Sequence, residues 1–357
     1  MLKYYSFTLF FFLIFIEPVA STSFAEANAL LKWKASFINH NSSILKSWNL
    51  DTKNSANLSN RPKSSSNPCN WFRISCIDES VNRLNLTNAS IQAFFYEFPF
   101  SSFPNLAYID LSLNRLFGII RPQIGQIPDS LSGLTSLRTL YLYNNQLSGP
   151  ILHELGKLTS LQDLELDMNH LTGQNPVLLS GLTSLRTLYL HTNQLFGPIP
   201  PELGKLTLLL DIALSTNHLM GQISTSLSRL ASLRTLFLYT NQLSSPIPLE
   251  LGKLTSLQDL ELDTNNLTGQ IPVSLGGLTI LRTLYLYNDQ LFGPILHELG
   301  KLTSFQDLEL STNHLTGQIP ISLSGLTSLR TLYLYTNQLS GPIPPELGKL
   351  TSLQDLE

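Results

Sequence analysis

Leucine recurs along the chain at intervals of two and three residues, and the whole pattern returns every 24 residues. Each unit reads L-x-x-L-x-L-x-x-N-x-L, a short alternating stretch that leads to an asparagine. A fixed period of this length is typical of repeat architectures, in which each unit stacks on its neighbours. The asparagines are Asn145, Asn169, Asn193, Asn217, Asn241, Asn265, Asn313 and Asn337, with Asp289 in the remaining place.

Two less regular units precede this series. Asn114 lies 31 residues before Asn145, which implies an insertion of seven residues between those units. One unit further back, Leu84, Leu86 and Ile91 fit the same frame. The sequence therefore predicts eleven repeats and the beginning of a twelfth over residues 81–357.

Each unit contains one predicted strand and one predicted helical turn. Leu332 and Leu334 alternate with Tyr333, as in a strand with one buried face. Residues 341–344 turn the chain, and residues 345–350 predict a short helical turn. Because one unit cannot bury its leucines alone, we predict an α/β solenoid. It is a right-handed, curved superhelix with a parallel β-sheet on the concave face and short helical turns on the convex face.

The asparagine at the end of each strand is predicted to be buried in the turn. Its amide group can both donate and accept hydrogen bonds for otherwise unpaired backbone groups. A carboxylate at Asp289 can only accept. We therefore predict that Asp289→Asn stabilises the fold by about 1 kcal/mol.

Two versions of the unit alternate along the chain, one rich in Arg, Thr and Tyr and the other in Gln, Asp and Glu. Tyr and Arg are frequent anchors at binding interfaces, and the acidic positions favour a basic or amine-bearing segment. We expect the concave face to bind a peptide or protein ligand. The predicted contact residues are Arg138, Tyr141, Tyr143, Glu165, Arg186, Tyr189, His191, Arg234, Phe237, Tyr239, Asp259, Glu261, Asp263, Arg282, Tyr285, Tyr287, Arg330, Tyr333 and Tyr335.

One repeat departs from this alternation, with Leu210, Ala213 and Ser215 where Gln, Glu and Asp occur elsewhere. The change predicts a local apolar notch, which is either a ligand pocket or sequence drift.

No catalytic site, metal site or cofactor is predicted. His170, His218 and His314 follow ladder asparagines at multiples of 48 residues, which places them about 10 Å or more apart, too far to share a metal ion. No phosphate loop, dinucleotide fingerprint or nucleophile elbow occurs.

Residues 1–25 have the features of a secretory signal peptide. Lys3 precedes an apolar run at 7–16, about half the length that a membrane span needs. We expect cleavage between Ala20 and Ala25. The formal net charge of −3 and the 13% of charged residues give no reason to expect nucleic acid as a partner.

In an oxidising compartment Cys69 and Cys76 favour one disulfide over a metal site, because no other Cys or His nearby completes a set of four ligands.

A glycan at Asn85 would exclude ligand from that end of the concave face. N-glycosylation motifs occur at Asn41, Asn57, Asn85, Asn88 and Asn266.

The L-x-G-x-I-P turn in a 24-residue unit resembles the plant type of leucine-rich repeat, found in receptor-like kinases and receptor-like proteins. Residues 26–34, 45–48 and 68–76 resemble the N-terminal cap of those receptors. The resemblance implies a cap at 26–80 in which an amphipathic helix and the cysteine pair close the first repeat. Arg73 stands where that family usually has Gly.

Receptors of this family bind a ligand on the concave side and recruit a co-receptor. The resemblance implies an extracellular recognition module, secreted or on the outer face of the plasma membrane, in plant development or defence signalling. A free secreted inhibitor of cell-wall-degrading enzymes is the second interpretation, although such inhibitors carry cysteine-rich caps at both ends. No second cysteine pair, membrane span or kinase signature occurs in these 357 residues. We therefore expect no enzyme in this sequence. A truncated fragment of a receptor kinase is the third interpretation.

Overall fold

The computed structural model describes residues 22–39, 45–49, 67–119, 134–174 and 177–357. Most of the expected signal peptide and the motifs at Asn41 and Asn57 lie outside these ranges. None of the helices in the described part of the chain is long and apolar enough to cross a membrane.

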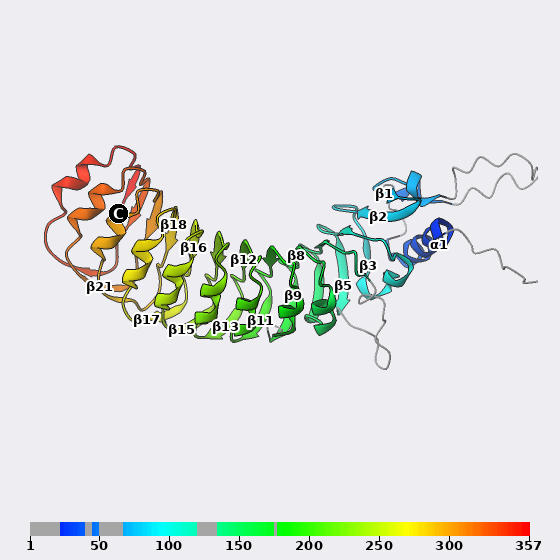
Figure 1. Ribbon diagram of the computed structural model, residues 1–357, viewed down its shortest axis with the longest axis horizontal. Coiled ribbons are helices and arrows are strands. Elements are labelled where there is room, and N and C mark those ends of the chain that lie inside the picture. The colour runs from blue at the N-terminus through cyan, green and yellow to red at the C-terminus, as the bar shows by residue number, and fades with distance from the viewer. Residues whose placement is uncertain (1–21, 40–44, 50–66, 120–133, 175–176) are drawn as a thin grey trace, which may run out of the picture.

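The described chain winds into a curved stack of coils, with one long sheet along its concave side (Figure 1). The first two strands of this sheet are antiparallel, and every later neighbour is parallel and in register. Its strands are β1 (Ile74–Ile77), β2 (Ser80–Asn85), β4 (Tyr108–Asp110), β6 (Thr139–Tyr141), β8 (Asp163–Glu165), β10 (Thr187–Tyr189), β12 (Asp211–Ala213), β14 (Thr235–Phe237), β16 (Asp259–Glu261), β18 (Thr283–Tyr285), β20 (Asp307–Glu309), β22 (Thr331–Tyr333) and β24 (Asp355–Leu356). The predicted leucine-rich-repeat solenoid is confirmed.

Short helical turns close the coils, as predicted, and those in the described part of the repeats are 3-10 helices. The predicted turn at 345–350 is η13 (Pro345–Lys349), in which the N–H of Leu350 donates to the carbonyl of Leu347 at 3.0 Å. The preceding turns are η5 (His153–Lys157), η6 (Val177–Gly181), η7 (Pro201–Lys205), η8 (Thr225–Arg229), η9 (Leu249–Lys253), η10 (Val273–Gly277), η11 (His297–Lys301) and η12 (Ile321–Gly325).

A second set of parallel strands, which the sequence pattern did not predict, lies along the other side of the stack (Figure 1). It forms where the segment after each ladder position pairs with its counterpart in the next coil. The first group is β3 (Gln92–Phe94), β5 (Arg115–Ile119), β7 (Gln146–Pro150), β9 (His170–Gln174), β11 (Gln194–Gly197), β13 (His218–Gly221), β15 (Gln242–Pro246) and β17 (Asn266–Thr268). A separate group is β19 (Phe292–Pro294), β21 (His314–Gly317) and β23 (Gln338–Leu339). The two groups of strands are separated between β17 and β19, and Asp289 lies in the chain between these two strands.

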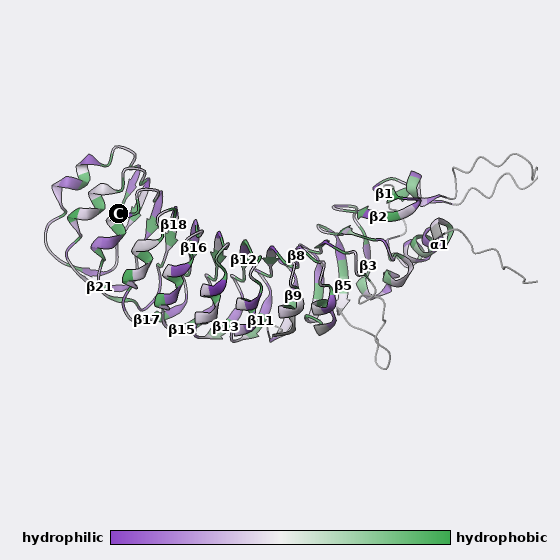
Figure 2. Cartoon of the chain, viewed as in Figure 1, coloured by the Kyte–Doolittle hydropathy of each residue, from purple (hydrophilic) through white to green (hydrophobic). Residues whose placement is uncertain are grey.

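The leucines of successive coils form one continuous core. In β22, Leu332 is fully buried, whereas its neighbour Tyr333 is half-buried and faces outward. The hydropathy pattern repeats from coil to coil along the stack (Figure 2). Stability is therefore shared between neighbouring coils and does not reside in one central core.

The asparagine ladder forms as predicted. The Nδ2 of Asn169 donates to the carbonyl of Leu166 in its own coil, at 3.1 Å, and to that of Leu142 in the preceding coil, at 3.0 Å. Its Oδ1 accepts from the backbone N–H of Leu147 at 3.0 Å. Each amide thus joins two coils and satisfies backbone groups that the turn leaves unpaired.

The N-terminal cap contains helix α1 (Thr22–Ala35) and the 3-10 turn η2 (Pro68–Asn70), whereas the 3-10 turns η3 (Phe95–Glu97) and η4 (Phe100–Ser102) follow in the first repeat. Cys69 and Cys76 form a disulfide, as expected. The rings of Trp48 and Trp71 stack with centroids 5.7 Å apart. Between the cysteines Arg73 adopts φ +67°, a left-handed conformation that explains why glycine is usual at this position.

Candidate ligand-binding face

The parallel register of the concave sheet arranges the predicted contact residues in columns that run across the strands. Three of these columns are defined here by their members. The arginine column is Arg138, Arg186, Arg234, Arg282 and Arg330 with Gln162, Leu210, Gln258 and Gln306 between them. The glutamate column is Tyr141, Glu165, Tyr189, Ala213, Phe237, Glu261, Tyr285, Glu309 and Tyr333. The outer column, two residues further along each strand, is Tyr143, Asp167, His191, Ser215, Tyr239, Asp263, Tyr287, Ser311 and Tyr335.

Asp259 belongs to a fourth column, in which aspartates alternate with threonines. The structure thus brings together every residue predicted for the face. Their role in binding stays a prediction.

Each aromatic strand presents two rings side by side. The ring centroids of Tyr141 and Tyr143 are 6.4 Å apart, and those of Tyr189 and His191 are 6.1 Å apart. The same pairing recurs at Phe237–Tyr239, Tyr285–Tyr287 and Tyr333–Tyr335, with centroids 6.3, 6.2 and 6.1 Å apart. Paired, partly buried rings are suited to holding flat or apolar ligand groups with little loss of side-chain freedom.

The carboxyl groups between these aromatic strands are held in an unfavourable electrostatic environment. Burial, together with the neighbouring Asp167 and Asp163, raises the pKa of Glu165 to about 7. Burial, together with Asp263 and Asp259, likewise raises the pKa of Glu261 to about 7. These side chains therefore titrate near neutral pH, and a cation brought to them would favour their charged form.

The two aspartates of the outer column differ in their hydrogen-bond partners. The carboxylate of Asp263 accepts hydrogen bonds from the hydroxyl of Thr264, at 3.2 Å, and from that of Tyr287. The Oδ2 of Asp167 lies 3.4 Å from the Nε2 of His191. Its Oδ1 is buried without a hydrogen-bond partner, as is the Nδ1 of His191. Asp167 is thus a buried acceptor that the protein leaves unsatisfied.

Charges on the concave face are mostly uncompensated. Within the described ranges, the ion pairs shorter than 4.0 Å are His191–Asp167 and His297–Glu298, and neither involves an arginine of the face. From β6 to β22 five arginines share the face with nine carboxyl groups. The carboxyl groups are Asp163, Glu165, Asp167, Asp211, Asp259, Glu261, Asp263, Asp307 and Glu309. The face therefore has a net acidic character.

The irregular repeat lies at β12. Ala213 is in register between Tyr189 and Phe237. Ala213 and Ser215 are only 4% and 1% exposed, although their counterparts in the neighbouring coils are larger side chains of the concave face. The notch predicted here is thus a place where two small side chains lie beneath larger neighbours, and it interrupts the row of carboxyl groups.

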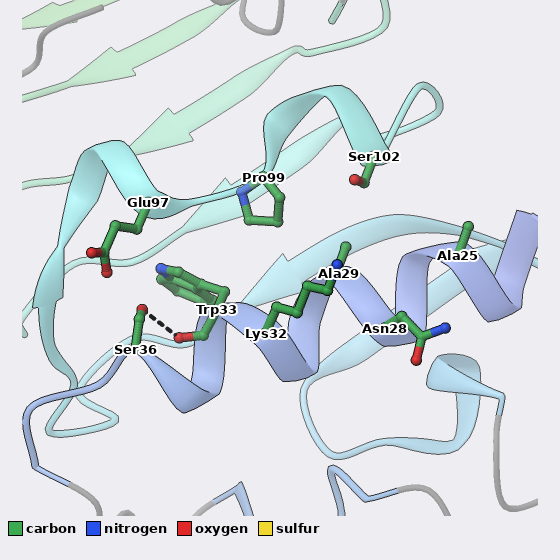
Figure 3. A pocket seen from close by; sticks show the side chains of 9 residues that line it. All are labelled: Ala25, Asn28, Ala29, Lys32, Trp33, Ser36, Glu97, Pro99 and Ser102. Carbon is green, nitrogen blue, oxygen red and sulfur yellow. Dashed lines mark hydrogen bonds between the residues drawn. The ribbon is translucent and has the colours of Figure 1, made fainter. Parts of the chain in front are cut away.

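A separate hollow of about 400 Å³ lies between α1 of the cap and the η3–η4 segment of the first repeat (Figure 3). Ala29, Lys32 and Trp33 line it from the helix, and Glu97 and Pro99 face them. Trp33 is 2% exposed, and its indole nitrogen has no hydrogen-bond partner. Sequence reasoning missed this hollow, because no motif marks it.

Three of the predicted glycosylation motifs lie in described segments. Asn85, in β2, is in register with Asp110 of β4, which itself aligns with Tyr141, so it belongs to the line of the glutamate column as expected. Asn88 and Asn266 are exposed. Modification of all three stays a prediction.

The sequence matches two protein families. One is the leucine rich repeat N-terminal domain, over residues 25–77. The other is the leucine rich repeat, over residues 136–158, 184–206, 232–254, 256–278 and 328–350. Together with the fold described above, these matches show that the chain contains leucine-rich repeats preceded by an N-terminal domain of the same type.

The relatives are plant receptor kinases. Over 121 residues the chain is 45% identical to the MDIS1-interacting receptor like kinase 2 of Arabidopsis thaliana. This match covers 32% of this chain and 10% of that protein. The ectodomain of the Arabidopsis receptor kinase HAESA, solved with an extended IDA peptide hormone ligand, is 29% identical with a TM-score of 0.80, covering 95% of this chain and 53% of that one. The complex of HAESA with IDA and the co-receptor SERK1 is 27% identical with a TM-score of 0.62, covering 92% and 64%.

The chain therefore spans about half of the HAESA ectodomain in the first of these structures and a tenth of the receptor kinase. Its likeness to such kinases lies in their ectodomain region. The sequence and fold resemble the extracellular recognition part of plant leucine-rich-repeat receptors.

Proposed function

We propose that this chain is the recognition part of a plant cell-surface receptor and binds a peptide or protein ligand on its concave face. The observation that carries the proposal is the alignment of paired aromatic rings and unpaired charges in columns across β6 to β22. Aromatic and arginine side chains gathered on one face are the residue types that binding interfaces favour.

The relatives support the same proposal. HAESA binds a peptide hormone and a co-receptor in the solved complexes. By analogy, the chain acts outside the cell, after removal of a leader at 1–25, through a cap at 26–80 and repeats at 81–357. It then signals in development or defence together with a second protein. Neither nucleic acid nor catalysis forms part of the proposed role.

Selection from a displayed peptide library tests the proposal. Selected peptides should lose at least tenfold in affinity for a variant carrying Tyr189→Ala and Tyr333→Ala, since hot-spot aromatics contribute more than about 1.4 kcal/mol when truncated. Phe196→Ala is the matched control, because Phe196 is 44% exposed but lies in β11, outside the concave sheet. Binding that the concave variant leaves unchanged would contradict the proposed face.

A further inference from the structure

Three carboxyl groups of the glutamate column lie between aromatic residues of both neighbouring strands. Strands lie about 4.8 Å apart, so the two flanking residues are about 9.6 Å apart. A cation above the central carboxyl group is then about 4.8 Å, one strand spacing, from each flanking residue, and a cation within about 6 Å of a ring centroid makes a cation–π contact. We call these arrangements acidic cages. They are Glu165 with Tyr141 and Tyr189, Glu261 with Phe237 and Tyr285, and Glu309 with Tyr285 and Tyr333.

A second carboxylate beside the β8 cage is incompletely hydrogen-bonded. Asp167, which follows Glu165 along the same edge, is 5% exposed, and its Oδ1 has no partner. A buried carboxylate oxygen without a donor is unfavourable. An ammonium or guanidinium group bound at Glu165 places a positive charge beside this carboxylate.

The spacing of the cages selects a ligand backbone. From β8 to β16 there are four strand intervals, about 19 Å, and from β16 to β20 two intervals, about 9.6 Å. A polyproline II helix has three residues per turn and rises about 3.1 Å per residue, so one turn covers about 9.3 Å. Curvature of the concave face brings side-chain tips slightly closer than the strands themselves, in the direction of this value.

Other regular backbones do not fit this spacing. A β-strand rises about 3.3 Å per residue and returns a side chain to the same face every second residue, or about 6.6 Å. An α-helix returns after a pitch of about 5.4 Å. Neither repeat divides the interval of two strands evenly.

We propose that the concave face binds a polyproline II segment whose basic side chains, spaced by multiples of three residues, enter the cages at β8, β16 and β20. The proposal rests on the proposed function and names its ligand class. At β12, where Ala213 stands in place of the cage glutamate between Tyr189 and Phe237, the same ligand carries an apolar residue. The expected order is basic, apolar, basic, basic at every third position, in one chain direction or the other.

Fluorescence anisotropy with labelled decapeptides tests this spacing. The phased probe is Arg-Pro-Pro-Leu-Pro-Pro-Arg-Pro-Pro-Arg, used together with its reversed sequence. The control, Arg-Pro-Leu-Pro-Arg-Pro-Pro-Pro-Arg-Pro, has the same composition and charge but places its arginines four residues apart. We expect the phased peptide, in one direction, to bind about tenfold more tightly than the control. Equal affinities, or no binding of the phased peptide in either direction, overturn the proposal.

A gain-of-function variant gives a second readout. Ala213→Glu restores the residue type of the regular acidic repeats and creates a cage at β12. This variant should bind a peptide with arginine in place of the leucine about tenfold more tightly than the parent does, whereas Ala213→Gln, of equal size, should not. If library peptides without this spacing bind and are lost in the Tyr189→Ala and Tyr333→Ala variant, the spacing proposal fails while the proposed function stands.

Discussion

The Oδ1 of Asp289 accepts a hydrogen bond from the backbone N–H of Leu267 at 2.7 Å, in the place where the regular coils use an asparagine. Its other carboxyl oxygen is buried without a partner. In the next coil the equivalent residue is Asn313. Its Nδ2 donates to the carbonyls of Leu286 and Leu310, at 2.7 and 3.2 Å. Asp289 therefore preserves the accepting half of the ladder contact.

Asp289→Asn should stabilise the protein by at least about 1 kcal/mol at neutral pH, because the amide donates to the backbone without the proton uptake that a buried carboxyl group requires. Burial raises the pKa of Asp289 to about 8 in the folded protein, against about 4 when unfolded. The unfolded chain then loses this proton at lower pH than the folded one, so the parent loses stability as pH rises from about 4 to about 8.

The stabilisation by Asp289→Asn should consequently grow over that range and level off above pH 8. Thermal unfolding of both proteins between pH 5 and pH 9 measures it. Asn313→Asp is the matched reciprocal change and should introduce a similar loss with rising pH. A constant difference between parent and variant at all pH values would contradict a buried, titrating Asp289.

Ser245→Gly should stabilise the protein by about 1 kcal/mol, since a residue with a Cβ atom is disfavoured in the left-handed region by that order. Ser245 has φ +78° at a position that is glycine in the neighbouring coils, such as Gly221 with φ +81°. Gly221→Ser is a clean reciprocal test, because a Cβ there meets no atom within 4 Å. Denaturant unfolding should give shifts of opposite sign for the two variants, and shifts of the same sign would disprove the backbone argument.

Replacing both cysteines of the Cys69–Cys76 disulfide by serine should destabilise the cap by about 2.5 kcal/mol on the chain-entropy model for so short a loop. Since coils interact only with their neighbours, the loss should be local. Hydrogen exchange should accelerate in β1 and β2 and remain unchanged in β14 to β22. Uniform acceleration along the whole stack would show that the cap controls the stability of the entire solenoid.

Affinity for a basic peptide should rise with pH between 6 and 8. Glu165 and Glu261 have pKa values raised to about 7, so they gain negative charge over this range and attract the cation more strongly. Isothermal titration at several pH values measures the slope, and a variant with Glu165→Gln and Glu261→Gln should flatten it. The charged and titratable groups around the two glutamates are Asp110, Asp163, Asp167, His191, Asp259, Asp263, Glu309, Tyr141, Tyr189, Tyr285, Arg138, Arg186, Arg234 and Arg282.

The period of the sequence predicted those features that one repeat determines by itself. Leu332 is buried and Tyr333 faces outward because a strand alternates its faces, and Asn169 lies in the ladder because every coil places it there. Features that depend on two neighbouring coils were not predictable. The second sheet, the contact between Asp167 and His191, and the burial of Ala213 each require the positions of side chains in the adjoining repeat.

The near-identity of alternate coils has a consequence for any ligand that touches only one or two of them. Sliding such a ligand by two strands returns it to almost the same surroundings, so it can occupy several equivalent positions with similar affinity. The strand at Asp211–Ala213 breaks this translational symmetry. A ligand long enough to reach across that strand can therefore bind in only one register along the stack.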